Sequence, residues 1–240
     1  MKTTSAKDKI IVALDVEDLP AALKLVELLH DGVGAFKIGK QLFTSTGPDA
    51  VRSIHGLGGR VFLDLKFHDI PTTVARASVE AARHDVFMFN MHALGGAAMM
   101  REAVRAVRAV PGLQKQPLMI AVTVLTSMGT DDLQPLGIAL PVDELVVRLA
   151  LLARDAGMSG VVASPREIGL IKKACGPDFI VVTPGIRPRG ADSNDQKRAM
   201  TPGEAVLAGA DFIVVGRPIT HATDPKAAAR SIAEEIAAAR

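Results

Sequence analysis

Hydrophobic residues along the chain fall into short runs rich in Val and Ile, which alternate with longer segments of mixed polarity. The short runs are nearly continuous in apolar residues, which is typical of parallel strands that are covered on both faces. We predict eight strands, at Ile10–Val16, Ala35–Gly39, Val61–Lys66, Val86–His92, Leu118–Leu125, Gly160–Ala163, Phe179–Thr183 and Asp211–Val215.

Segments of helical length separate these runs. From Leu19 to His30 the apolar residues recur at helical spacing. Capping boxes with a proline at the first helical position open two more helices, at Ser164–Glu167 and Thr201–Glu204. Eight strands that alternate with helices in about 250 residues predict a (β/α)8 barrel, a TIM barrel, as a single domain over residues 1–240. A doubly wound open sheet is disfavoured, because no GxGxxG motif follows the first strand.

Composition narrows the class of partner. The 240 residues include 28 Lys and Arg against 26 Asp and Glu, and there is no Trp or Tyr. Nucleic-acid binding, which uses basic surfaces and aromatic stacking platforms, is therefore not expected. No apolar run is long enough for a membrane span, and the first residues lack a signal-peptide cleavage pattern. The single cysteine, Cys175, suits a reducing compartment. We expect a cytoplasmic protein that acts on a small molecule.

Charged residues interrupt the apolar runs where the predicted strands end, which is where (β/α)8-barrel enzymes place their active sites. Asp15 follows the first run, and Lys37 lies inside the second. In the third segment, FLDLKFHDIPTT, Asp64 and Lys66 are two residues apart and share one face of the strand, and Asp69 follows just after it. Charged side chains usually lie in solvent. Because Asp64 and Lys66 interrupt a strand that must be buried, we interpret them as functional.

The alternation of charge restricts the chemistry of this cluster. A lysine flanked by carboxylates keeps its ammonium form, whereas a Schiff-base lysine must be neutral. We therefore expect Lys66 to act as a fixed positive charge and a proton donor. A magnesium ion between Asp64 and Asp69 is the weaker interpretation, since the lysine already supplies a cation there.

The last two predicted strands are followed by segments suited to phosphate. The eighth strand runs into Gly216 and Arg217, and the loop from Gly185 to Met200 carries Arg187 and Gln196. Loops after strands seven and eight are the customary phosphate site of (β/α)8 barrels, with backbone N–H groups and arginine as donors. We expect phosphate to bind here and the loop to close over the ligand.

Two polar residues at other strand ends are less informative. His92 ends the fourth predicted strand and fits a ligand contact or a structural role equally well. Thr126 follows the fifth and fits either a contact to the amide edge of a heterocycle or a cap of its own loop. The residue types alone leave both assignments open.

Six segments in matching order and spacing resemble the orotidine 5′-phosphate decarboxylase family. They are ALD at 13–15, FKIGKQLF at 36–43, FLDLKFHDIPTT at 62–73, AVTVLTSM at 121–128, VTPGIRP at 182–188 and VVGRPIT at 214–220. The resemblance runs from Ile10 to about Pro225. Thr72 and Ala93 depart from the Asn and Ser that are common in the family, and neither change removes a charge.

The resemblance implies decarboxylation of orotidine 5′-monophosphate (OMP) to UMP and CO₂ in de novo pyrimidine biosynthesis, with no cofactor and no metal. It implies that Lys66 protonates C6 and that Asp64 lies beside the substrate carboxylate. It also implies a homodimer with shared active sites, in which Asp69 reaches into the neighbouring subunit's site. The resemblance further implies that Asp15 and Lys37 bind the ribose and that Lys37 also helps to hold the charged residues in place. Thr73 is implied to lie near Asp69, and Thr126 to contact the pyrimidine. The implied contacts on the phosphate side are Arg187, Gln196, Gly216 and Arg217.

Two other functions are the alternatives. A Mg²⁺-dependent sugar-phosphate decarboxylase or synthase on the same barrel shares the D-x-K-x-x-D core, but such enzymes typically have an acidic residue where Lys37 stands. A catalytically silent nucleotide-binding barrel belongs to a different class of protein. The complete set of alternating charges argues against it.

Overall fold

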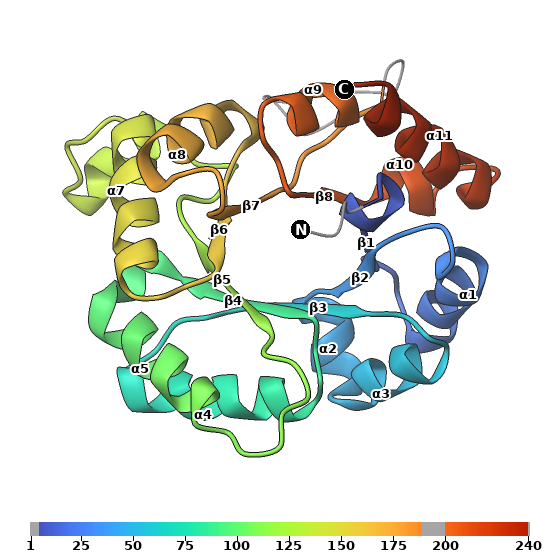
Figure 1. Ribbon diagram of the computed structural model, residues 1–240, viewed down its shortest axis with the longest axis horizontal. Coiled ribbons are helices and arrows are strands. Elements are labelled where there is room, and N and C mark those ends of the chain that lie inside the picture. The colour runs from blue at the N-terminus through green and yellow to red at the C-terminus, as the bar shows by residue number, and fades with distance from the viewer. Residues whose placement is uncertain (1–4, 189–199, 240) are drawn as a thin grey trace.

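The computed structural model describes residues 5–188 and 200–239. Within them, eight parallel strands close into a barrel in chain order, each paired with its sequence neighbour and β8 paired with β1 (Figure 1). This arrangement confirms the predicted (β/α)8 barrel. The strands are β1 (Ile10–Ala13), β2 (Ala35–Ile38), β3 (Val61–Phe67), β4 (Met88–His92), β5 (Leu118–Val122), β6 (Gly160–Val162), β7 (Ile180–Thr183) and β8 (Phe212–Val215).

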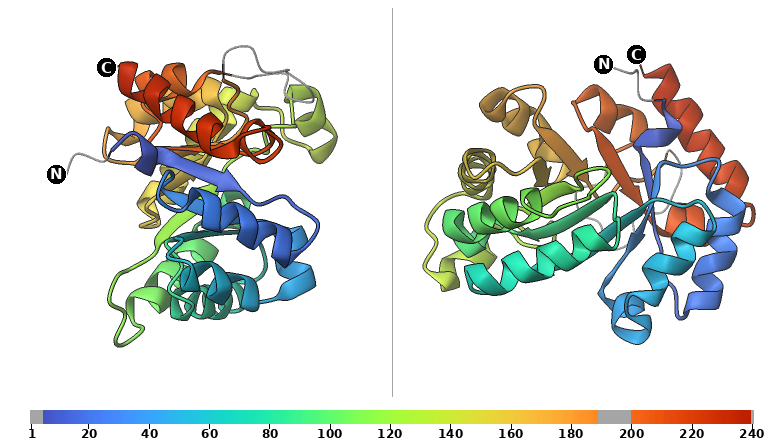
Figure 2. Two further views of the ribbon diagram at one scale, coloured as in Figure 1. Left: turned by 90° about the vertical axis from the view of Figure 1, so that its right-hand side faces the viewer. Right: turned by 60° about the horizontal axis from the view of Figure 1, so that its bottom comes forward.

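Helices form a ring outside the barrel, and α11 packs beside α1 so that the last helix closes the ring next to the first (Figures 1 and 2). The longer helices are α1 (Leu19–Leu29), α3 (Asp49–Gly56), α4 (Pro71–Arg83), α5 (Gly96–Arg108), α7 (Val142–Asp155), α8 (Ile168–Cys175) and α11 (Pro225–Ala238). The shorter helices are α2 (Lys40–Thr46), α6 (Thr130–Leu133), α9 (Pro202–Leu207) and α10 (Arg217–Thr220). In the described part of the chain, none of these helices is long and apolar enough to cross a membrane.

Local capping explains where several helices begin. The Asp18 carboxylate accepts from Ala21 N–H at 2.8 Å and starts α1. At α9 the predicted capping box forms, because Thr201 N–H donates to the Glu204 carboxylate at 2.9 Å and the Thr201 hydroxyl accepts from Glu204 N–H. Such caps satisfy backbone donors that have no partner inside the helix.

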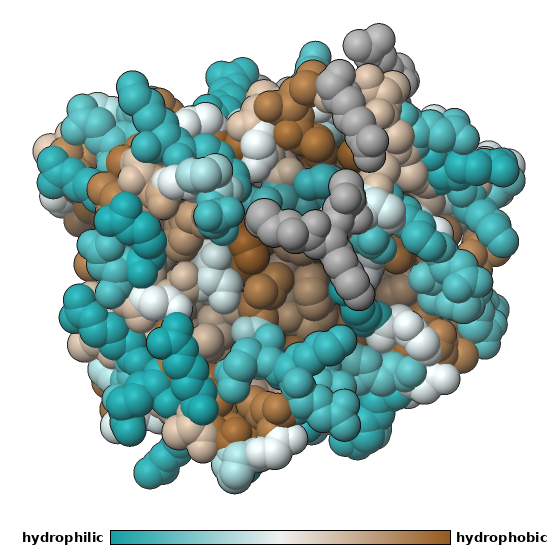
Figure 3. All heavy atoms as spheres, in the orientation of Figure 1, coloured by the Kyte–Doolittle hydropathy of each residue, from teal (hydrophilic) through white to brown (hydrophobic). Residues whose placement is uncertain are grey.

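The core has two layers. Inward-facing residues such as Phe62 and Met88 fill the barrel, while Leu63, Phe89 and Met91 pack between the barrel and the helices. This alternation along β3 and β4 is the two-residue period of a strand. On the face seen in Figure 3, hydrophobic residues reach the surface near the centre of the ring, and hydrophilic residues cover most of its rim.

Seven of the eight strands are shorter than the sequence predicts, and two of them, β1 and β5, end three residues early. β1 ends at Ala13 rather than Val16, and β5 ends at Val122 rather than Leu125. After β5 the apolar run continues because its side chains line a cavity at the carboxyl end of the barrel instead of forming part of the sheet. The strand ends therefore form the walls of a site.

Candidate active site

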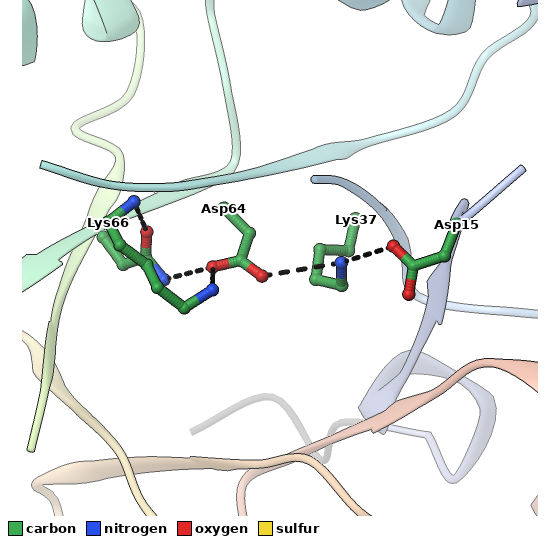
Figure 4. A network of polar contacts seen from close by, with 5 residues as sticks. Asp15, Lys37, Asp64 and Lys66 are labelled. Carbon is green, nitrogen blue, oxygen red and sulfur yellow. Dashed lines mark hydrogen bonds and ion pairs between the residues drawn. The ribbon is translucent and has the colours of Figure 1, made fainter. Parts of the chain in front are cut away.

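Four charged side chains of alternating sign form a row at the carboxyl end of the barrel, and we call them the charge array (Figure 4). Lys66 Nζ donates to Asp64 Oδ1 at 2.5 Å, and Asp64 Oδ2 lies 3.5 Å from Lys37 Nζ. Lys37 Nζ in turn donates to Asp15 Oδ1 at 3.0 Å. The structure thus brings together, from the ends of β1, β2 and β3, the charges that the sequence places far apart.

Burial makes this pairing necessary. The side chains of Lys37 and Asp64 are only 10% and 13% exposed, whereas Asp15 at the end of the row is 64% exposed. A buried charge is tolerated when it is paired, and the interaction is stronger where water is excluded. The buried middle of the array is therefore held in place by its own neighbours.

Gly39 gives the array the space that it needs. A Cβ atom at this position would lie 3.2 Å from both Asp15 Oδ1 and Lys37 Nζ, closer than side chains normally approach. Gly39 is the N-cap of α2, directly after β2. The absence of a side chain there allows the Lys37–Asp15 ion pair to form against the backbone.

The strand that carries Asp64 and Lys66 is irregular at this point. Leu63 pairs with Phe89 and Phe67 with Met91, so four steps along β3 match two steps along β4. Lys66 has a φ of +54°, a conformation that side chains rarely adopt and that clusters at functional sites. The side chain of Asn90, which the sequence pattern does not single out, contacts this bulge.

A cavity of about 210 Å³ opens over the charge array. Apolar side chains form much of its wall, and Lys37, Asp64, Lys66 and Thr126 supply its polar groups. An apolar pocket with a few convergent polar groups is the usual form of a small-molecule site. Among the described residues, no group of three or more His, Cys, Asp or Glu side chains could hold a metal ion.

The candidate phosphate residues lie after β7 and β8. Gly216 is the N-cap of α10, and Arg217 is its first residue and is exposed. Arg187 N–H donates to Met200 O at 3.1 Å, so the two ends of the loop after β7 are tied together. Gln196 and most of the loop expected to close over the ligand lie outside the described residues.

Asp69 is exposed on the segment that leads from β3 into α4, and Thr73 is exposed in the first turn of α4. The Asp69 carboxylate accepts from Ile70 N–H at 2.6 Å. Within the described residues, no hydrogen bond or ion pair joins Asp69 to the charge array. This chain therefore does not bring Asp69 to Lys66 by itself.

His92 lies beside the site rather than among the residues that line its cavity. Its ring is 5.4 Å from that of His68. Burial, followed by the effects of His68, Lys66 and Lys40, lowers the pKa of His92 below its ordinary value of 6.5, against a smaller opposing effect of Asp64. His92 is therefore neutral near pH 7.

The lowered pKa of His92 predicts a pH dependence of stability. Between 6.5 and the lower folded pKa, the unfolded chain binds more protons than the folded one, so the free energy of unfolding falls as the pH falls below about 6.5. We expect the melting temperature of wild type to drop more between pH 7 and pH 5 than that of His92→Gln, measured by circular dichroism. Identical slopes for the two proteins would contradict this assignment.

A closed barrel of parallel strands, with a charged cavity at their carboxyl ends, defines the class of this protein as a (β/α)8-barrel enzyme. Residues 8–232 match the family described as "Orotidine 5′-phosphate decarboxylase / HUMPS family". The chain belongs to this family.

Relatives and solved structures place the chain within that family. It is 58% identical to an orotidine 5′-phosphate decarboxylase of Syntrophotalea carbinolica over 98% of this chain and 97% of that one. It is 56% identical to the protein of the same name from Geobacter sulfurreducens, over 99% and 100%. A crystal structure of orotidine 5′-phosphate decarboxylase from Lactobacillus acidophilus matches with a TM-score of 0.84 and 38% identity, over 95% of this chain and 98% of that one.

Proposed function

We propose that this protein decarboxylates OMP to UMP and CO₂ in pyrimidine biosynthesis, with Lys66 as the proton donor and without a metal or cofactor. The observation that carries the proposal is the charge array, in which the Lys66 ammonium lies 2.5 Å from Asp64 at the wall of the cavity. The names of the relatives support the same reaction.

The proposed reaction divides into two steps at the pyrimidine ring. The bond between C6 and the carboxylate carbon breaks, CO₂ leaves, and the electron pair stays on C6 as a carbanion that the ring cannot delocalise well. A cation fixed beside C6 stabilises this charge as it develops, because it needs no reorganisation at that moment. The Lys66 ammonium then gives its proton to C6, which yields UMP and a neutral amine that regains a proton from solvent.

The rest of the array positions this cation and the substrate. Asp64 contacts Lys66 and Lys37 at once and would lie next to the substrate carboxylate. We assign the ribose hydroxyls to Lys37 and Asp15, which are joined at 3.0 Å. We assign the edge of the pyrimidine to Thr126, which lies on the cavity wall.

The phosphate group is proposed to bind at the loops after β7 and β8. Arg187 and Arg217 supply the positive charge, and Gly216 and Gln196 complete this side of the site. Arginine pairs well with phosphate because its planar group can donate two parallel hydrogen bonds. Binding energy from a group so far from C6 can be used to lower the barrier of the chemical step.

The Mg²⁺-dependent sugar-phosphate enzyme is the alternative within the same barrel. Lys37 stands between two carboxylates, 3.0 Å from Asp15 and 3.5 Å from Asp64, and so occupies the place that a metal would need. The relatives at 53–58% identity are named orotidine 5′-phosphate decarboxylase. Both observations favour the pyrimidine substrate.

One assay tests the proposed function against its alternatives. The protein is mixed with OMP, with EDTA present and absent, and the loss of the ultraviolet absorbance of the substrate is followed. We expect equal rates under both conditions, because Lys66 supplies the positive charge. Absence of turnover would favour a silent nucleotide-binding barrel, and activity that EDTA abolishes and Mg²⁺ restores would contradict the metal-free reaction.

We further propose a cytoplasmic homodimer that shares its active sites. Ile70, next to Asp69, is 65% exposed, and Leu94, two residues after the end of β4, is 47% exposed. Exposed apolar residues that form one patch often mark a surface that another chain covers, and we assign Ile70 and Leu94 to such a patch. A second copy docked here would carry Asp69 and Thr73 toward the array of its neighbour.

The shared site predicts recovery of activity on mixing two inactive variants. Lys66→Ala and Asp69→Ala each lack one required group, but in a heterodimer one of the two sites has both. With random exchange, we expect about one quarter of the wild-type activity, since half of the dimers are mixed and each of them has one intact site. Recovery is measured after confirmed subunit exchange, and its absence would contradict shared sites.

A further inference from the structure

Asn90 is a buried polar residue inside the barrel that the proposed reaction does not use. It is 1% exposed and lies on β4, in phase with the inward-facing Met88 and out of phase with Phe89 and Met91. A buried amide is costly unless its donors and acceptor are satisfied. The partners that it finds therefore indicate its role.

The amide of Asn90 contacts both residues at the centre of the proposed reaction. Its Oδ1 accepts from the backbone N–H of Lys66 at 2.8 Å, and its Nδ2 donates to Asp64 Oδ1 at 2.7 Å. The orientation of the amide follows from chemistry, because a backbone N–H can only donate and so must face the oxygen. The nitrogen is then left for the carboxylate.

The first contact replaces a hydrogen bond that the sheet cannot make. β3 has extra residues between Leu63 and Phe67, where its register against β4 shifts. Lys66 lies in this bulge at a φ of +54°, and its N–H is bonded by a side chain of β4. An unusual backbone conformation persists when its surroundings hold it in place.

The second contact fixes the carboxylate without adding charge. Asp64 Oδ1 accepts from both Lys66 Nζ and Asn90 Nδ2, while Oδ2 faces Lys37 at 3.5 Å. Because the amide is neutral, it orients Asp64 and leaves the alternation of charge along the array unchanged. A lysine or aspartate in its place would alter that balance.

We propose that Asn90 is a positioning residue for the decarboxylation. By holding the backbone of Lys66 and the carboxylate of Asp64 with one side chain, it sets the direction in which the ammonium points from the bulge into the cavity. The inference rests on the proposed function, and it adds a requirement for a residue that does not touch the substrate.

Two substitutions test this role. Asn90→Leu keeps much of the volume and removes both polar contacts, and Asn90→Ala serves if the leucine does not fold. The matched control is Asp211→Ala at the opposite end of the barrel, since Asp211 also accepts from a strand N–H, that of Val181, at 2.8 Å and also binds a lysine, Lys172. All variants are compared by kcat and KM for OMP and by melting temperature.

A readout that does not need turnover is the affinity for two ligands, measured by calorimetry. UMP is the product, and 6-hydroxyuridine 5′-monophosphate, when ionised, places negative charge near the position where the carbanion develops. An array that is complementary to the transition state prefers the second ligand. Misplacement of Lys66 should reduce this preference and leave the binding of UMP almost unchanged.

We expect kcat to fall by about 100-fold in Asn90→Leu, the size of effect that a displacement of about 1 Å produces. KM and the affinity for UMP should change by less than about threefold, and the preference for the charged ligand should fall with kcat. Asp211→Ala should lose melting temperature but keep kcat and the preference. If the wild type is active and the Asn90 variants keep kcat, or lose no more of it than the control does, the positioning role alone is overturned. If the wild type is inactive, the proposed function is overturned.

Discussion

Lys66→Ala should bind UMP and lose nearly all turnover. Lys66 is proposed both to stabilise the carbanion and to protonate it, and the structure places its ammonium 2.5 Å from Asp64 at the cavity wall. Loss of a preorganised charge and loss of a general acid each cost orders of magnitude, so together they predict a fall in kcat of about 10⁴-fold or more. The measurement is kcat with saturating OMP, beside the affinity for UMP.

Lys172→Ala is the matched control for this experiment. Lys172 also donates to an aspartate, Asp211, at 2.7 Å, but it lies at the amino end of the barrel, away from the cavity. Its loss should lower the melting temperature with little change in kcat. If Lys66→Ala kept a substantial fraction of kcat, the proposed mechanism would be wrong.

Arg217→Ala should lower kcat/KM for OMP by about 2–5 kcal/mol, the cost of truncating one partner of a buried charge pair, or about 30- to 5,000-fold. Arg217 is exposed at the start of α10, so the free protein needs it little for folding. In the proposed complex, the side chain would pair with the phosphate and so become part of a buried charge pair. The effect on activity should therefore exceed the effect on melting temperature.

Comparison of UMP with uridine, which lacks the phosphate, makes this test specific. Arg217→Ala should weaken the binding of UMP and leave the binding of uridine unchanged, because only UMP offers the group that Arg217 is proposed to contact. Arg52→Ala, an exposed arginine paired with Asp49 on α3, is the control for a general loss of charge. Equal weakening of UMP and uridine binding would contradict a phosphate contact.

The barrel was predictable from the sequence because its signals are local. Nearly continuous apolar runs, separated by helical segments with recognisable caps such as the one at Thr201, predict parallel strands that alternate with helices. Ends of strands were less predictable. The run after β5 stays apolar because its residues line a cavity, and hydrophobicity alone does not distinguish a cavity wall from a strand.

The charge array was predictable in part for the same reason. Asp64 and Lys66 interrupt a buried strand, which marks them at once, and the pleat puts them on one side. Asn90 could not be found this way, because its role depends on a bulge in β3 that no residue pattern announces and on a strand 26 residues away. The contacts of Asp69 could not be checked in the same way, since Asp69 is proposed to complete the active site of a second copy, which a single chain does not contain.

The residues proposed for the chemical step and those proposed for phosphate binding lie on opposite halves of the barrel. The charge array and Asn90 come from β1 to β4, while Arg187 and Arg217 follow β7 and β8. Neither half on its own has both the proposed reacting groups and the proposed phosphate-binding residues. The two halves meet where β8 pairs with β1. A substrate that contacts both the charge array and the two arginines would link the two halves of the barrel where β8 pairs with β1. The proposed catalysis therefore requires the closed ring, because only the pairing of β8 with β1 brings the two sets of residues to one proposed site.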